Sequence, residues 1–329
     1  MKHLSPGRKV THWILKMSNF TNSVTEFLLM GFSDTTELQI LHSLLFFLIY
    51  LVAMLGNLLI VLITTIDRRL HSPMYFFLRN LSIVDACFIS ITIPKASVNY
   101  LVNNRAISVT GCAAQIFLVI FMAYVELTLL TVMACDRYVA IFHPLLYPVV
   151  MSPRVCIQMT FICLFTGLLY AGFHTGYTFQ LSFCQSNVIH QFFCDIPSLL
   201  KISCSETFSN TLSLLGSGLV VVVGCFTFIT ASYISIFSTV LKFPVKANQR
   251  KAFFTCVPHI IVVSLFLISG LYVYLQPPSD SGSIKDIIFS IFYSIIPPFM
   301  NPIIYSLRNK QIKEAIRIVM ERKLFFLRK

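Results

Sequence analysis

Long apolar segments recur along the whole chain, and they restrict its fold more than any other feature. A helix that crosses the hydrocarbon core of a bilayer needs about 20 mostly apolar residues. Segments of this kind lie at 38–66, 73–101, 110–142, 155–176, 208–241, 252–275 and 284–307. Of the 329 residues 56% are hydrophobic and only 12% are charged, which leaves too little charged surface for a soluble fold. We therefore predict an all-α bundle of seven transmembrane helices.

The basic residues indicate how the bundle is oriented. An odd number of spans places the two chain ends on opposite sides, and Lys and Arg accumulate in cytoplasmic loops. With the C-terminus inside, 17 of the 25 Lys and Arg residues are cytoplasmic and the other 8 are not. We expect an extracellular tail (1–37), a seven-transmembrane domain (38–307) and a cytoplasmic tail (308–329) that forms a short amphipathic helix. The net charge of +12 then reflects membrane orientation and lipid headgroups, and no nucleic-acid partner is expected.

The outer side carries a glycosylation signal and four cysteines. Asn19 begins an Asn-Phe-Thr sequon, and residues 1–16 before Met17 are interpreted as an optional extension. Cys112 precedes the third span, and Cys184, Cys194 and Cys204 lie in the long outer loop. This compartment is oxidising, so two disulfides are expected, with three pairings possible.

Ionisable side chains inside a bilayer are costly and usually functional. Asp85 lies in the second span and Glu126 in the third, while Asn57 and Asn301 lie at similar depth in the first and seventh. Two neighbouring carboxylates cannot both ionise cheaply without a cation. They are expected to share a proton or to hold Na⁺; the alternative is a purely structural hydrogen-bond network.

Two motifs mark the cytoplasmic ends of spans. Asp136-Arg137-Tyr138 ends the third span, where Asp136 and Arg137 are expected to form an ion pair that opening would break. Residues 301–305 (NPIIY) end the seventh span, where Pro302 removes a backbone donor and Asn301 is expected to satisfy the freed carbonyl. A kinked helix of this kind is a candidate hinge.

Enzyme and transport functions find less support. The chain lacks the HExxH, GxSxG and phosphate-loop patterns, so no enzyme is predicted, and His259 is interpreted as a packing or switch residue. A transporter or channel lined by Asp85 and Glu126 is the main alternative, and the odd span number and absence of inverted repeats count against it.

Several motifs, in a fixed order, resemble the tetrapod-type odorant (olfactory) receptors of the rhodopsin-like G-protein-coupled class. They are Leu55-Gly56-Asn57, 73–78 (PMYFFL), 133–141 (MACDRYVAI), 143–145 (HPL), Ser232-Tyr233, Lys251-Ala252-Phe253 and 298–309 (PFMNPIIYSLRN). The resemblance runs from about Phe27 to Arg317. The chain departs from it at Cys135, at 266–268 (FLI) and at 190–191 (HQ), and its one tryptophan is Trp13.

The resemblance implies specific roles for residues. Cys112 would pair with Cys194 and Cys184 with Cys204, and Asp85, Glu126 and Asn301 would form a sodium site. The implied switch residues are Asp136, Arg137, Tyr138, Tyr233, His259, Asn301, Pro302 and Tyr305. The implied partners are an odorant, membrane lipid and a stimulatory olfactory-type G protein that raises cyclic AMP, in the plasma membrane. No cofactor other than Na⁺ is expected.

The ligand is expected in the outer half of the bundle, where helical spacing selects the lining. The predicted lining residues are Val119, Ile120, Ala123, Tyr124, Ser217, Gly218, Val221, Leu267, Gly270, Leu271, Tyr274, Ser290 and Ser294. None is charged, and burying an unpaired charged ligand beside them would cost several kcal/mol. A small, neutral, largely apolar volatile is therefore predicted, oriented by Tyr124, Ser217 or Tyr274.

Overall fold

A computed structural model describes most of the chain. The described residues are 24–30, 36–102, 105–184, 186–241, 249, 253, 256–257, 259–266, 268, 284–308 and 311–318. The glycosylation signal at Asn19 and the predicted lining residues Leu267, Gly270, Leu271 and Tyr274 lie outside them, and so does the side chain of Ser290.

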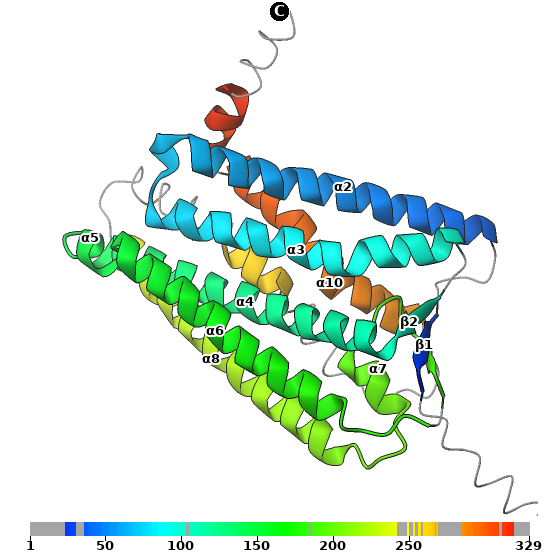
Figure 1. The fold of residues 1–329 in the computed structure, drawn as a ribbon. Coiled ribbons are helices and arrows are strands. Elements are labelled where there is room, and N and C mark those ends of the chain that lie inside the picture. Colours follow the sequence, from blue (N-terminus) through cyan, green and yellow to red (C-terminus); the bar gives the residue numbers. More distant parts are fainter. Residues whose placement is uncertain are drawn as a thin grey trace, which may run out of the picture.

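Long helices confirm the all-α fold class (Figure 1). Five of them, within the described residues, are long and apolar enough to cross a membrane: α2 (Thr36–Ile66), α3 (Pro73–Val102), α4 (Val109–Phe142), α6 (Pro153–Thr178) and α8 (Phe208–Val240). The expected seventh span corresponds to α10 (Ile284–Arg308). The expected sixth span is described only in part, and residues 259–266 of it are helical.

Local sequence explains where several helices begin. Pro73 and Pro153 are the first residues of α3 and α6, a position where the missing N–H costs nothing. At the start of α4 the hydroxyl of Ser108 accepts a hydrogen bond from the backbone N–H of Gly111 at 3.1 Å. Beyond α10, residues 311–318 form the expected amphipathic helix, with Ile312 and Ala315 buried and Lys313 exposed.

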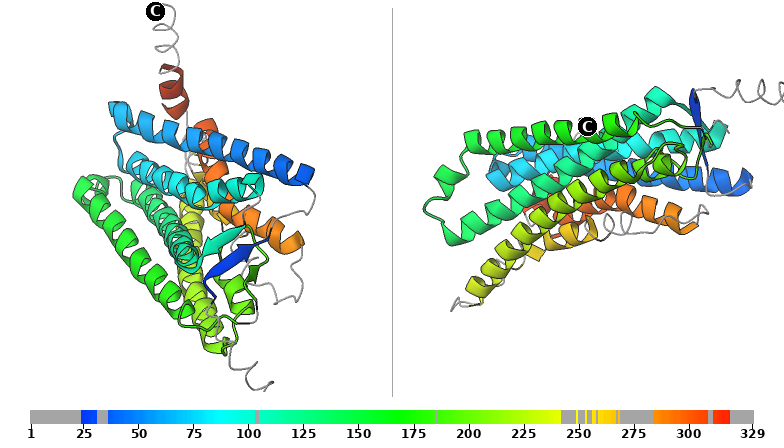
Figure 2. Two further views of the ribbon diagram at one scale, coloured as in Figure 1. Left: turned by 45° about the vertical axis from the view of Figure 1, so that its right-hand side comes forward. Right: turned by 90° about the horizontal axis from the view of Figure 1, so that it is seen from below.

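The helices pack around α4, which contacts α3, α6 and α8, while α2 contacts α3 and α10 (Figure 2). Buried side chains therefore concentrate on α3 and α4. The outward faces of α6 and α8 are apolar, and Phe161, Phe165, Leu219 and Val220 are each more than half exposed. Such faces suit a helix whose surroundings are lipid.

A small sheet that the sequence did not predict covers part of the end of the bundle that is expected to be extracellular (Figure 1). Strand β1 (Glu26–Leu29) lies between β2 (Ala106–Ser108), to which it is antiparallel, and β3 (Val188–Ile189), to which it is parallel. Phe27 of β1 is fully buried, and its ring lies edge-on to that of Phe183 at 5.5 Å between centroids. The segment that precedes the first span is thus anchored to the bundle.

Three short helical segments complete the description. The 3₁₀ helix η1 (Arg68–Leu70) follows α2, α5 (Tyr147–Val150) lies between α4 and α6, and α7 (Ile196–Lys201) lies in the long outer loop. They matter here because α5 and η1 carry polar contacts at one end of the bundle, and a buried acid caps α7 at the other end.

Candidate functional site

Two buried acids from different helices meet on one amide in the interior of the bundle. The side-chain N–H₂ of Asn301 on α10 donates to Asp85 Oδ2 on α3 at 2.9 Å and to Glu126 Oε1 on α4 at 3.2 Å. Both acids are completely buried. Asp85 Oδ1, Glu126 Oε2 and Asn301 Oδ1 are buried without a hydrogen-bond partner among the described residues. The structure brings these three predicted residues together, and three of their oxygens have no hydrogen-bond partner among the described residues.

The backbone carbonyl that Pro302 leaves unpaired in α10 is satisfied from a different helix than expected. Pro302 has no N–H, so the carbonyl of Pro298, four residues earlier, loses its helical partner. Asn57 on α2 donates to that carbonyl at 2.9 Å, and also to the carbonyl of Ala53 at 3.0 Å. The expectation that Asn301 does this is wrong, because its amide is directed to the two acids. The kink therefore links α2 to α10.

The expected ion pair between Asp136 and Arg137 is not formed. The ion pairs that the described residues form join Arg69 to Asp67 and to Glu314. Asp136 instead accepts a hydrogen bond from the hydroxyl of Tyr147 on α5 at 2.7 Å. Burial, followed by the charge of Asp136, raises the pKa of Tyr147, so this hydroxyl keeps the proton that it donates.

Arg137 points away from its neighbouring acid. Its guanidinium contacts the Met74 sulfur on α3. On the same side of the bundle Tyr233 of α8 and His259 form a hydrogen bond of 2.7 Å between Oη and Nδ1. The hydroxyl of Tyr305 on α10 is buried and has no partner among the described residues. Four helices thus bring Arg137, Tyr233, His259 and Tyr305 to one end of the bundle. Tyr138 stacks there on Phe142, with 4.6 Å between ring centroids.

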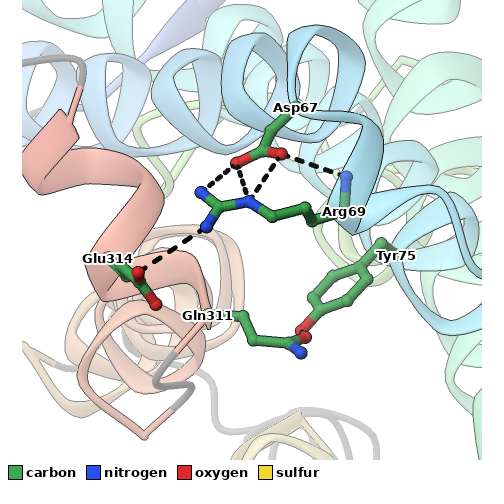
Figure 3. Close-up of polar contacts among 5 residues, drawn as sticks. All are labelled: Asp67, Arg69, Tyr75, Gln311 and Glu314. Carbon is green, nitrogen blue, oxygen red and sulfur yellow. Dashed lines mark hydrogen bonds and ion pairs between the residues drawn. The ribbon is translucent and has the colours of Figure 1, made fainter.

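A polar network also joins η1 to the helix that follows α10 (Figure 3). Arg69 lies between two acids, with nitrogen–oxygen distances of 2.8 Å to Asp67 and 3.6 Å to Glu314. The hydroxyl of Tyr75 donates to Gln311 Oε1 at 2.6 Å. The hydrogen bonds from Arg69 lower the pKa of Asp67, which stays ionised. This network joins the helix at residues 311–318 to η1 and α3.

The long outer loop is held by two disulfides and an acid. Cys112 is bonded to Cys194 and Cys184 to Cys204, with Cα–Cα distances of 5.5 and 5.8 Å, which is the pairing that the resemblance implied. Asp195 accepts from the backbone N–H of Ser198 at 3.2 Å at the start of α7. Burial raises the pKa of Asp195 to about 6 despite that hydrogen bond.

The predicted ligand-lining residues that are described come from α4, α8 and α10. Val119 and Ser294 are buried, while Ile120, Ala123, Tyr124, Ser217, Gly218 and Val221 are partly buried. Ser217 differs from the expectation, because it already contacts His174 Nε2 at 2.9 Å and Tyr170 Oη at 3.3 Å on α6.

Several functional contacts could not be read from the sequence. His174, Tyr170 and Tyr147 were not selected, because each acquires its role from a partner on another segment. The available signal was weak: a histidine within an apolar span for His174 and a tyrosine shortly after the third span for Tyr147.

The fold is that of a rhodopsin. The structure of squid rhodopsin superimposes with a TM-score of 0.66 at 16% sequence identity, covering 89% of this chain and 88% of that one. The sequence profile of the olfactory receptors matches residues 46–323. Human olfactory receptor 14C36 is 62% identical over 93% of this chain and 98% of its own length, and human olfactory receptor 14A16 is 51% identical over 94% and 99%. The chain belongs to the olfactory receptor family, which makes it a multi-pass membrane receptor rather than an enzyme.

Proposed function

We propose that this protein binds a small, neutral, largely apolar volatile within the helix bundle and activates a stimulatory olfactory-type G protein, which raises cyclic AMP. Membership of the olfactory receptor family supports the class of ligand. The observation that carries the proposal is the chain of contacts from Asp85 and Glu126 through Asn301 to the kink at Pro302. It connects the interior of three helices to the cytoplasmic end, where Tyr305 lies.

The chemistry of the expected lining supports a neutral ligand. The described lining residues on α4, α8 and α10 are apolar side chains, glycine, serine and tyrosine, and none carries a charge. A charged ligand would have to give up its hydration without gaining a counter-ion there, at a cost of several kcal/mol. A volatile compound with few polar atoms has little hydration to lose, so this desolvation penalty does not arise.

The two buried acids suit a monovalent cation or a shared proton. Asp85, Glu126 and Asn301 would hold Na⁺ through oxygens that lack partners among the described residues, and oxygen is the donor that a hard cation prefers. A cation there neutralises acid charge that burial makes costly. We propose that occupancy of this site favours the closed bundle, because Asn301 belongs both to the site and to the kinked part of α10.

The cytoplasmic end supports coupling to a G protein. Arg137 is not paired with a carboxylate among the described residues, and Tyr233, His259 and Tyr305 lie on the same side. A free guanidinium at the opening of a helix bundle can donate to carbonyl oxygens of an inserted partner segment. We propose that movement of α10 and of the helix that carries His259 exposes the guanidinium of Arg137 to the G protein.

The expected location is the plasma membrane with the N-terminus outside. Two disulfides support an outer position for the long loop, because such bonds form in oxidising compartments. The basic residues on the opposite side and the sequon at Asn19 agree with that orientation.

The test is a cyclic AMP assay with volatile compounds in cells that contain the stimulatory G protein. Arg137→Ala should abolish the response while surface labelling stays near the unmodified level, because the arginine serves the G protein and not the fold. Arg154→Ala is the matched control, since Arg154 is exposed at the start of α6. A full response of Arg137→Ala would contradict the proposed coupling.

A further inference from the structure

A polar and aromatic cluster lies where α4, α6 and α8 meet. Ser217 of α8 contacts four groups: the carbonyl of Ser213 at 2.7 Å, His174 Nε2 at 2.9 Å, Tyr170 Oη at 3.3 Å and the carbonyl of Leu214 at 3.4 Å. His174 is only 2% exposed. The ring of Tyr170 stacks on that of Tyr124 of α4, with 5.1 Å between centroids.

Counting protons assigns the direction of these bonds. The hydroxyl of Ser217 has one proton and two lone pairs. Its shortest contact, to the carbonyl of Ser213, is to a group that can only accept, so the proton goes there. Both lone pairs then accept, one from His174 Nε2–H and one from the hydroxyl of Tyr170. The proton and both lone pairs of the Ser217 hydroxyl are therefore used, and none is available to a ligand.

The two tyrosines retain the unused hydrogen-bonding capacity. The hydroxyl of Tyr170 donates its proton to Ser217 Oγ, but the lone pairs of the Tyr170 oxygen accept no hydrogen bond from the described residues. The hydroxyl of Tyr124 forms no hydrogen bond to any described residue, so it can both donate and accept. Both side chains are only partly buried. Together they offer one free donor, on Tyr124, and free acceptor oxygens on both rings.

Glycines hold this pair in position. A Cβ on Gly167 of α6 would lie 3.2 Å from Cδ1 of Tyr124 and 3.0 Å from Cγ2 of Val125, so a larger residue there would require these side chains to shift by a few tenths of an ångström. A Cβ on Gly218 of α8 would lie 3.6 Å from the Tyr170 hydroxyl. Helix packing thus places both rings between α4 and α6, with the hydroxyl of Tyr170 over the backbone of α8.

We propose that the tyrosine pair Tyr124 and Tyr170 recognises a hydroxyl group, so that the preferred ligands are aliphatic alcohols or phenols. This inference rests on the proposed function. The ligand oxygen accepts from Tyr124, and the ligand proton is donated to Tyr170. A ketone can use only the first of these bonds and an alkane neither, so for one carbon skeleton the order of potency is alcohol, ketone, alkane.

The experiment measures cyclic AMP dose–response curves for an alcohol, a methyl ketone and an alkane of equal carbon number. Tyr170→Phe should weaken the alcohol about fivefold and leave the ketone unchanged, since one neutral hydrogen bond is lost. Tyr124→Phe should weaken both by a similar factor. Tyr177→Phe, the same change further out on α6, should alter neither. Surface labelling of each variant corrects for expression.

A second variant should remove the preference for the alcohol over the ketone. Ser217→Ala releases the proton of Tyr170, which can then donate to a ketone oxygen, so the ratio of ketone to alcohol potency should rise about fivefold. A purely structural role would lower all responses equally. If Ser217→Ala does not reach the surface, the two phenylalanine variants still decide the question.

The outcomes separate the two proposals. Volatiles that activate the receptor, with an alcohol-to-ketone ratio that Tyr170→Phe does not change, overturn hydroxyl recognition and leave the proposed function standing. A receptor that reaches the surface and responds to no volatile overturns both.

Discussion

Asn301 joins three helices through one amide, and the oxygens around it set the electrostatics of the interior. If Na⁺ binds there, replacing choline chloride by NaCl at constant ionic strength should raise the melting temperature of the purified receptor, because a ligand of the folded state stabilises it. Asp85→Asn and Glu126→Gln each remove a charge that attracts the cation, and both should abolish this rise.

The matched control for the sodium experiment is Asp67→Asn, which removes an acid from the exposed network of η1. This variant should keep the sodium effect in full. A melting temperature that responds to Na⁺ equally in all four proteins would argue for a shared proton or a structural network at the buried acids.

Asp195 makes stability depend on pH. Its pKa is about 6 in the folded receptor against 3.8 for an unperturbed aspartate, so folding favours the protonated form. Stability should therefore rise as the pH falls from 7 through 6 towards 4, and ionisation near pH 7 costs about 3 kcal/mol. Asp195→Asn keeps the cap of α7 and removes the charge.

We expect Asp195→Asn to melt higher than the unmodified receptor at pH 7, and the difference to shrink as the pH approaches 4. Melting curves in detergent at several pH values measure this difference, which cancels the titration of other acids. A difference that stays constant with pH would mean that Asp195 keeps its ordinary pKa.

The hydrogen bond of Tyr147 shows why individual side-chain contacts cannot be predicted from the sequence. Adjacent Asp136 and Arg137 suggest a pair, but the short helix α5 brings a hydroxyl to the acid from eleven residues away. The three residues of the buried acid site were predictable, because apolar spans contain few ionisable groups and those at similar depth tend to meet. The contacts of Tyr170 and His174 were not predictable, because the rotation of each helix about its axis decides which of its faces touches a neighbouring helix.

Helices and strands differ in how well the sequence predicts them. The expected spans 73–101 and 155–176 became α3 (Pro73–Val102) and α6 (Pro153–Thr178), because a long apolar run needs no distant partner to form hydrogen bonds. Strand β1 has four residues and β3 has two, too few for their sequence to reveal a strand, although the residues of β1 alternate between exposed and buried. Their pairing depends on segments far apart in the chain, which local sequence does not encode.

Gly56 of α2 packs against Pro302 of α10. A Cβ there would lie 3.1 Å from Cβ and Cγ of Pro302, beside the hydrogen bond from Asn57 to Pro298. Gly56→Ala should push the helices apart slightly and lower the melting temperature. Gly56→Leu should prevent most of the protein from reaching the cell surface.

Gly224→Ala on α8 is the matched control for the Gly56 variants, because no heavy atom lies within 4 Å of the Cβ that it would add. Alanine favours a helix over glycine by up to about 1 kcal/mol, so this variant should be neutral or slightly stabilising. Equal behaviour of the Gly56→Ala and Gly224→Ala variants would show that the contact with Pro302 is not tight.

The orientation of the bundle can be tested directly. An epitope before the first span should be labelled on intact cells, and one after residue 329 only after permeabilisation, because the basic residues hold the C-terminal side in the cytoplasm. Labelling of both epitopes on intact cells would contradict seven spans.

Strand β1 has a consequence for biosynthesis. It leaves the ribosome before any span, yet β2 follows the second span and β3 follows the fourth. β1 can therefore pair with β2 once two hydrophobic segments have been made, and with β3 only after four. The sheet can close only after these segments have assembled. A chain with a defective β3 would be fully inserted and would still present an unpaired strand edge to the chaperones that retain unfinished proteins.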